Sequence, residues 1–186
     1  MEQEKMEHGK MDHDKMGHEK HSSYGKFFAM IATSMVAMYG LMYLNTYDVS
    51  HVRWSDTRLF MTFIMGAAMA VIMLSFMQGM YKNKQANLAI YAGSVVVFLI
   101  ALYLVRSQAT IQDSSWMRAM IPHHSIAILT SERATINDVR VRELADEIIE
   151  AQRREIEEMD WLLEDIAENG IAATDDAAEA RPVPSF

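Results

Sequence analysis

Residues 59–80 read LFMTFIMGAAMAVIMLSFMQGM, an uncharged and mostly apolar stretch that decides the fold class of the chain. Two further runs are similar: FFAMIATSMVAMYGLMYL at residues 27–44 and NLAIYAGSVVVFLIALYLV at residues 87–105. Each run reaches the roughly 18–22 residues that a helix needs to cross about 30 Å of hydrocarbon. Buried helices of a soluble protein are the alternative, but the remaining chain is too short to cover three of them. The sequence therefore predicts three transmembrane helices within residues 27–106.

Small residues recur one helical turn apart in two of these runs. Gly66 and Ala70 lie in the second run, and Ala89 and Gly93 lie in the third. Such pairs let two helix backbones approach closely in a membrane. The methionines at every fourth position of the second run are interpreted as packing residues, with a copper path through the membrane as the alternative.

Charge is concentrated outside the apolar runs. Residues 113–186 carry seven arginines and seventeen acidic residues, and the whole chain has a net charge of −8. An acidic domain of this kind repels the phosphate backbone, so nucleic acid is excluded as a partner. The chain has no cysteine, which excludes disulfides and thiolate metal sites.

The charges near the membrane predict an orientation. Three spans place the N-terminal tail and residues 81–86 on one side, and residues 45–58 and the C-terminal domain on the other. The first side carries six lysines near the membrane and the second carries four arginines. Because basic residues are enriched on the cytoplasmic side, we expect a cytoplasmic tail and an external, periplasmic C-terminal domain.

Residues 1–26 contain a short repeat. Three copies of M-x-H-x-K begin at residues 6, 11 and 16, and a further histidine follows them. The segment is polar and poor in branched apolar residues, so it is predicted to be disordered. Methionine and histidine donors favour transition-metal capture, and the alternative is a solvated leader whose lysines meet anionic lipid. The candidate ligands in this tail are His8, His13, His18 and His21.

The strongest helical periodicity lies in residues 141–166. At 100° per residue, the apolar positions fall within an arc of about 140° and nearly all charges fall opposite. Gln152 and Glu155 break this rule, because both lie inside the apolar arc. Since burying an unpaired carboxylate is costly, Glu155 is expected to have a partner. That partner is either a metal ion or, alternatively, an internal hydrogen bond or salt bridge with Arg118 or Arg133.

A histidine pair precedes this helix in WMRAMIPHHSIAIL, residues 116–129. Helical spacing puts Met117, Met120 and His124 on one face, with His123 at its edge. Imidazole nitrogen and thioether sulfur together suit copper better than magnesium or calcium, which prefer oxygen. The segment therefore predicts a copper site, with zinc among the other metals it could hold.

The order of these residues resembles a known family. The pattern M-I-P-H-H-x-x-A-I, followed by L-A-x-x-I-I-x-x-Q-x-x-E-I-x-x-M-x-W-L, is similar to domain-of-unknown-function family 305 over about residues 114–168. Members resemble ferritin-like helical hairpins and include bacterial periplasmic or membrane proteins linked to copper binding and tolerance. The resemblance implies metal-site roles for Met120, His123, His124, Gln152, Glu155 and Met159.

The chain departs from that family pattern after the histidines. Members often carry Gln-Gly there and a methionine six positions beyond the second histidine. This chain has Ser125, Ile126 and Thr130 at those positions, and Met117 is the candidate substitute for the missing sulfur.

These observations predict an all-α chain with four parts. The tail (1–26) is followed by the membrane region (27–106), a metal-binding helical hairpin (107–170) that breaks near Asn137-Asp138, and a flexible acidic tail (171–186). Two helices bury little apolar surface, so the hairpin is expected to complete a four-helix bundle by pairing in a homodimer or higher homo-oligomer.

The predicted function is copper binding for metal sequestration or tolerance by a multi-pass protein of the bacterial inner membrane. The chain is not expected to be an enzyme. A structural or accessory membrane subunit without a functional metal site is the first alternative. A ferritin-like di-iron oxidase is the second, but its Glu-x-x-His motif occurs nowhere in the chain.

Overall fold

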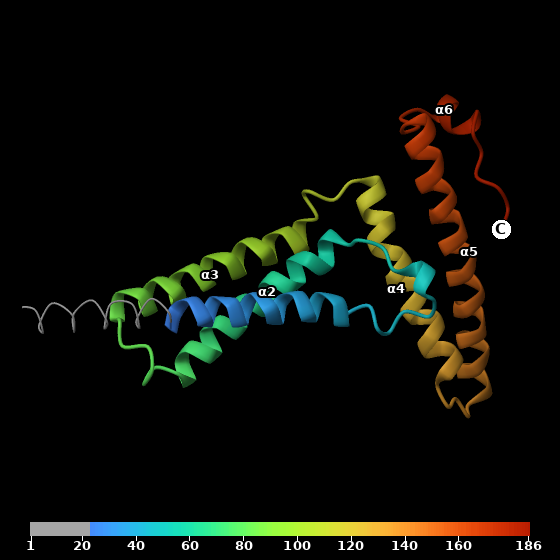
Figure 1. Cartoon of the computed structure of the whole chain (residues 1–186). Helices are drawn as coiled ribbons and strands as arrows, with labels where there is room; N and C mark the ends of the chain where they lie inside the picture. The colour runs from blue at the N-terminus through green and yellow to red at the C-terminus, as the bar shows by residue number, and fades with distance from the viewer. Residues whose placement is uncertain (1–22) are drawn as a thin grey trace, which may run out of the picture. The chain divides into compact units, whose positions relative to one another are not determined.

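The computed structural model describes residues 23–186, which form helices joined by short connections (Figure 1). No strand occurs among these described residues, which confirms the all-α prediction. The tail histidines His8, His13, His18 and His21 lie outside the described residues. The elements are a first helix at residues 23–41, η1 (Val49–His51), α2 (Asp56–Phe76), α3 (Lys84–Ser107), α4 (Asp113–Arg133), α5 (Val139–Asn169) and α6 (Asp175–Glu179).

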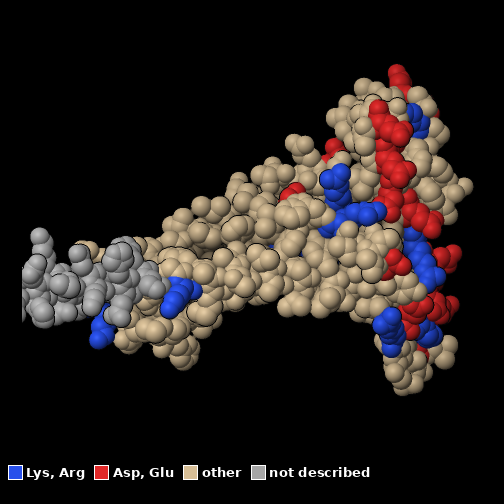
Figure 2. All heavy atoms as spheres, in the orientation of Figure 1, with Lys and Arg blue, Asp and Glu red and all other residues tan. Residues whose placement is uncertain are grey.

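The described chain forms two compact units. The first unit comprises residues 23–39 and 60–106, and the second comprises Gly40–Leu59 and Ser107–Phe186. Charged side chains are sparse over α2 and α3 but dense over α5, as Figure 2 shows. Each unit therefore has its own kind of surface, and each is described separately below.

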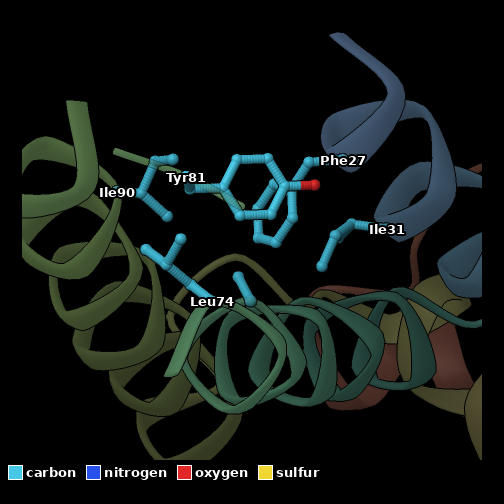
Figure 3. Close-up of a cluster of buried hydrophobic side chains, with 6 residues drawn as sticks. Phe27, Ile31, Leu74, Tyr81 and Ile90 are labelled. Carbon is cyan, nitrogen blue, oxygen red and sulfur yellow. The ribbon is translucent and has the colours of Figure 1, made fainter. Parts of the chain in front are cut away.

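The first unit is built around aromatic and aliphatic side chains from all three of its helices (Figure 3). Phe27 of the first helix and Leu74 of α2 are fully buried, and the Phe27 ring meets Tyr81 edge-on at 5.4 Å between centroids. The Tyr24 hydroxyl donates to Oδ1 of Asn87 at 2.8 Å. These contacts join the start of the first helix to the α2–α3 connection, so the first helix runs antiparallel to α2.

Glycine controls the packing of the first helix against α2. A Cβ atom on Gly66 would overlap the sulfur of Met35, closer than real atoms approach. The close helix approach predicted from Gly66 is therefore present. Gly93 differs, because a Cβ atom there would meet nothing within 4 Å. The second pair of small residues thus makes no comparable helix contact in the described chain.

Two helices of the described chain, α2 and α3, are long and apolar enough to cross a membrane. The sequence predicted three such helices. The run at residues 27–44 is helical only to residue 41, because residues 42–45 form a turn. The first helix therefore carries a shorter apolar stretch than the sequence run suggested.

The second unit is a helical hairpin of α4 and α5, with a core of Met117, Ile121, Ile128, Ile156 and Met159. The predicted break at Asn137-Asp138 falls in the connection between the two helices. Asp138 caps α5, since its Oδ1 accepts from the Arg140 N–H at 2.9 Å. Gly170 ends the helix with a φ of 77°, a left-handed conformation that glycine adopts without strain.

The chain after α5 folds back on that helix. Thr174 caps the short helix α6, and Arg181 pairs with Asp165 of α5 at 2.6 Å between Nη1 and Oδ2. The pair is largely shielded from solvent, which favours a fixed geometry over a rotating surface contact. Residues 171–186, expected to be a loose tail, thus contain a helix and an anchored arginine that composition did not indicate.

Candidate metal site

The hairpin brings a histidine of α4 against a carboxylate of α5. Nδ1 of His124 lies 3.2 Å from Oε2 of Glu155. Gln152, one turn earlier on α5, donates from Nε2 to the same oxygen at 3.2 Å. Glu155 therefore has the partner that its position in the apolar arc predicted. That partner is a histidine, and neither of the predicted arginines, Arg118 and Arg133, forms an ion pair with Glu155 in the described chain.

The two side chains differ in burial. The His124 side chain is 13% exposed, whereas that of Glu155 is 41% exposed. The inference that the carboxylate is buried was therefore too strong, because Glu155 lies at the edge of the apolar arc rather than under α4. Nδ1 of His124 is itself buried, and the contact with Glu155 lacks the alignment of a hydrogen bond. Among the described residues, this nitrogen is one of two buried side-chain atoms without a hydrogen-bond partner.

Burial also sets the protonation of this histidine. It lowers the pKa of His124 below the ordinary histidine value, and His123 acts in the same direction while the Glu155 carboxylate opposes both. His124 is therefore neutral near pH 7, and a neutral imidazole keeps a lone pair for a metal. The site combines a neutral nitrogen donor with an adjacent carboxylate oxygen.

Two thioethers lie next to this pair. Met120 is one turn before His124 on α4, and Met159 is one turn after Glu155 on α5. Because the helices are antiparallel, these two steps lead to the same level of the hairpin. Met159 is buried in the hairpin core and Met120 packs against that core. The structure thus brings together His124, Gln152 and Glu155, and it places Met120 and Met159 one helical turn away, at the hairpin core.

The two other predicted donors of the hairpin lie apart from this group. His123 is exposed, and its ring centroid is 6.1 Å from that of His124. Met117 is buried in the core but lies two turns from His124, or about 10 Å along the helix. Helical spacing placed all four α4 residues near one face, but the distance along the helix separates Met117 from His124, and His123 is exposed.

Comparisons with known proteins agree with the residue pattern. Residues 104–182 match the family described as a domain of unknown function, DUF305. Uncharacterized protein L153 of Acanthamoeba polyphaga mimivirus is 31% identical over 145 residues, covering 74% of this chain and 93% of that protein. The chain belongs to the DUF305 family. No solved structure matches it. The match extends past α5, so α6 and Arg181 are part of the DUF305 domain.

The loop between the first helix and α2 docks on this DUF305 domain, which the sequence did not indicate. Ser125 of α4 is fully buried, and its Oγ accepts from the Tyr47 N–H at 2.7 Å and lies 2.9 Å from Nδ1 of His51. Arg53 pairs with Asp160 of α5 at 3.2 Å. Ser125 was visible in the sequence only as a departure from the family pattern. Its real role is to anchor a loop 74 positions earlier in the chain.

The donor set limits which metals the domain fits. The described residues contain no group of three or more His, Cys, Asp or Glu side chains that could hold a metal ion. Nitrogen and oxygen donors of a single described hairpin are therefore too few for a four-coordinate site. A metal site here would therefore need thioether sulfur, a second copy of the hairpin, or both to complete it.

Proposed function

We propose that the chain is a membrane-anchored copper-binding protein that serves metal sequestration or tolerance. The observation that carries this proposal is the meeting of His124 and Glu155, with the buried Nδ1 free of any hydrogen bond. A nitrogen kept neutral and without a hydrogen bond costs stability unless something binds it. A metal ion at this position is a partner that satisfies the nitrogen and the carboxylate together.

The neighbouring sulfurs favour copper(I) over harder ions. Thioether ligands select soft metals, whereas magnesium and calcium require several oxygen donors that the hairpin lacks. Structural zinc sites usually take four strong donors, and one hairpin offers a single buried histidine and one carboxylate. A site of one imidazole with Met120 and Met159 suits copper(I) best.

The proposal includes pairing of two hairpins. Leu144 of α5 is about half exposed on the same edge of the apolar arc as Glu155, and Val141, one turn earlier, is also about half exposed. Ile156 and Met159, later in the helix, are buried against α4. A second hairpin laid over the open edge would bury these apolar residues in a four-helix bundle and shield Glu155 from water.

The tail and the membrane region complete the proposal. The repeated methionines and histidines of residues 6–21 capture metal by the same donor chemistry. The first helix serves as a third span, because it packs on α2 at Met35 and Gly66 and contacts α3 through the Tyr24–Asn87 hydrogen bond. With three spans and the lysine bias, the tail is cytoplasmic and the DUF305 domain periplasmic in a bacterial inner membrane.

Two other functions compete with copper binding. An accessory membrane subunit would use the histidine only for packing, but the described packing gives its buried nitrogen no aligned hydrogen bond, only the Glu155 oxygen at 3.2 Å. A di-iron oxidase would need several carboxylates facing one another, and the described hairpin brings only Glu155 to the histidine. The unsatisfied nitrogen favours copper binding over both.

Copper(I) titration of the full-length protein in detergent, against a competing chelator, tests the function. We expect His124→Ala to weaken binding at the hairpin by at least about 100-fold, since loss of a supporting contact alone costs about 10–100-fold. His51→Ala is the matched control, because it removes another histidine of the second unit that contacts Ser125 instead. Equal copper affinity in wild type and His124→Ala would reject the site.

A further inference from the structure

An apolar groove of about 780 Å³ opens between the three helices of the first unit. Its walls include Phe28 and Met35 of the first helix, Gly66 and Ala70 of α2, and Ala89 and Gly93 of α3. Small side chains keep the groove wide on two of its sides. Because a side chain added at Gly93 would meet nothing within 4 Å, this part of the groove is unfilled by the unit itself.

The groove extends along half of the helices that form it. Its lining runs from Tyr24 to Met35 on the first helix and from Ala86 to Val97 on α3. Each of these stretches is about 16 Å long at 1.5 Å per residue. That length equals about half of a 30 Å hydrocarbon core, the depth of a single leaflet. A partner helix crosses the whole membrane, so a half-length groove fits one acyl chain better.

One end of the groove is polar and basic. Tyr24 and Asn83 line this end, where the Tyr24 hydroxyl donates to Asn87 at 2.8 Å. Lys82 and Lys84 flank Asn83, and all three lysines of the described first unit, Lys26 included, are exposed at this end. The described part of this unit contains no acidic residue, so these ammonium groups have no ion-pair partner within it.

We propose that this groove binds an anionic phospholipid, with one acyl chain along the small residues of α2 and α3 and the phosphate at Lys82 and Lys84. Basic groups beside clefts between membrane helices are suited to acidic lipid headgroups. The length of the groove, about the depth of one leaflet, fits a single acyl chain, and the lysines favour a negatively charged headgroup. This inference rests on the proposed insertion of the first unit in a bilayer and is independent of copper binding.

Native mass spectrometry of the full-length protein tests the proposal. The protein is released from detergent after incubation with equal amounts of phosphatidylglycerol and phosphatidylcholine that carry identical acyl chains. We expect one retained phosphatidylglycerol per chain, preferred over phosphatidylcholine by roughly tenfold because of the lysines. Lys82→Gln with Lys84→Gln should remove the preference, whereas Arg106→Gln at the far end of α3 should keep it.

A matched pair of substitutions tests the groove itself. Val97 and Val95 are both exposed on α3, but only Val97 lines the groove. Val97→Phe should reduce lipid retention several-fold, and Val95→Phe should leave it unchanged.

The proposal would be overturned by equal retention of both lipids by the wild type, by unchanged retention in Val97→Phe, or by a lipid-free dimer. If Val97→Phe fails to fold, the headgroup preference of the wild type and its loss in the lysine variant still test the proposal. Copper binding should persist in every one of these variants, so its loss would point to a different failure.

Discussion

The two units of this chain satisfy their polar groups by different means. In the first unit, the described residues include no acid, and its interhelical polar contacts gather near the α2–α3 connection, where Tyr24 donates to Asn87 and the Tyr91 hydroxyl pairs with that of Ser75. In the second unit, ion pairs run along α5 and fix both the loop and the C-terminal segment to it. An apolar unit inserted in lipid would tolerate an open groove, whereas in the polar unit the candidate site is marked by the buried His124 nitrogen beside the Glu155 carboxylate.

Membrane topology gives the largest expected effect, because each site lies either on one side of the membrane or on the other. A reporter fused after Phe186 should be active only in the periplasm, and a tag inserted after Asn45 should be reached from that same side. Both follow from the lysine bias and from the docking of residues 40–59 on the hairpin. Protease protection in inverted and right-side-out vesicles provides the control. Labelling of the two sites from opposite sides of the membrane would contradict the docking of residues 40–59 on the hairpin.

Sequence patterns predicted the parts of this molecule that depend on one segment at a time. Hydropathy located α2 and α3, and helical periodicity located α5 and singled out Gln152 and Glu155. Contacts between distant segments could not be predicted, because periodicity says which face is apolar but not what covers it. The choice of His124 over an arginine as the partner of Glu155 is one example. The Ser125 anchor is another, since it joins residues 74 positions apart.

Alanine substitutions at two glycines test the helix packing within the first unit. Gly66→Ala should lower stability by about 1 kcal/mol, because its Cβ meets the Met35 side chain and forces that methionine to move. Gly93→Ala should be neutral or stabilising by about 0.5 kcal/mol, since its Cβ meets no atom and alanine favours the helix. Thermal unfolding of both variants in the same detergent measures the difference. Equal effects would mean that the first helix does not pack on α2 as described.

The pH dependence of stability gives the smallest effect. Because the pKa of His124 is lowered by burial, the unfolded chain binds more protons than the folded chain below the ordinary histidine pKa of about 6.5. The stability linked to neutral His124 is therefore complete above that pH and is lost as the pH falls toward the lowered pKa. Without metal, the melting temperature of the wild type should fall more between pH 7.5 and 5.5 than that of His124→Gln. Parallel pH profiles would show that His124 is not buried.

The central claim is that histidine nitrogen and methionine sulfur of the α4–α5 hairpin hold copper together. Copper X-ray absorption spectroscopy on the chain lacking residues 2–21 tests this directly, because the tail methionines and histidines are then absent. We expect both imidazole and sulfur scatterers in the first coordination shell, with the sulfur signal lost in Met120→Leu with Met159→Leu and kept in the control Met69→Leu. A shell of nitrogen and oxygen alone, or a sulfur signal unchanged by the paired substitution, would contradict it.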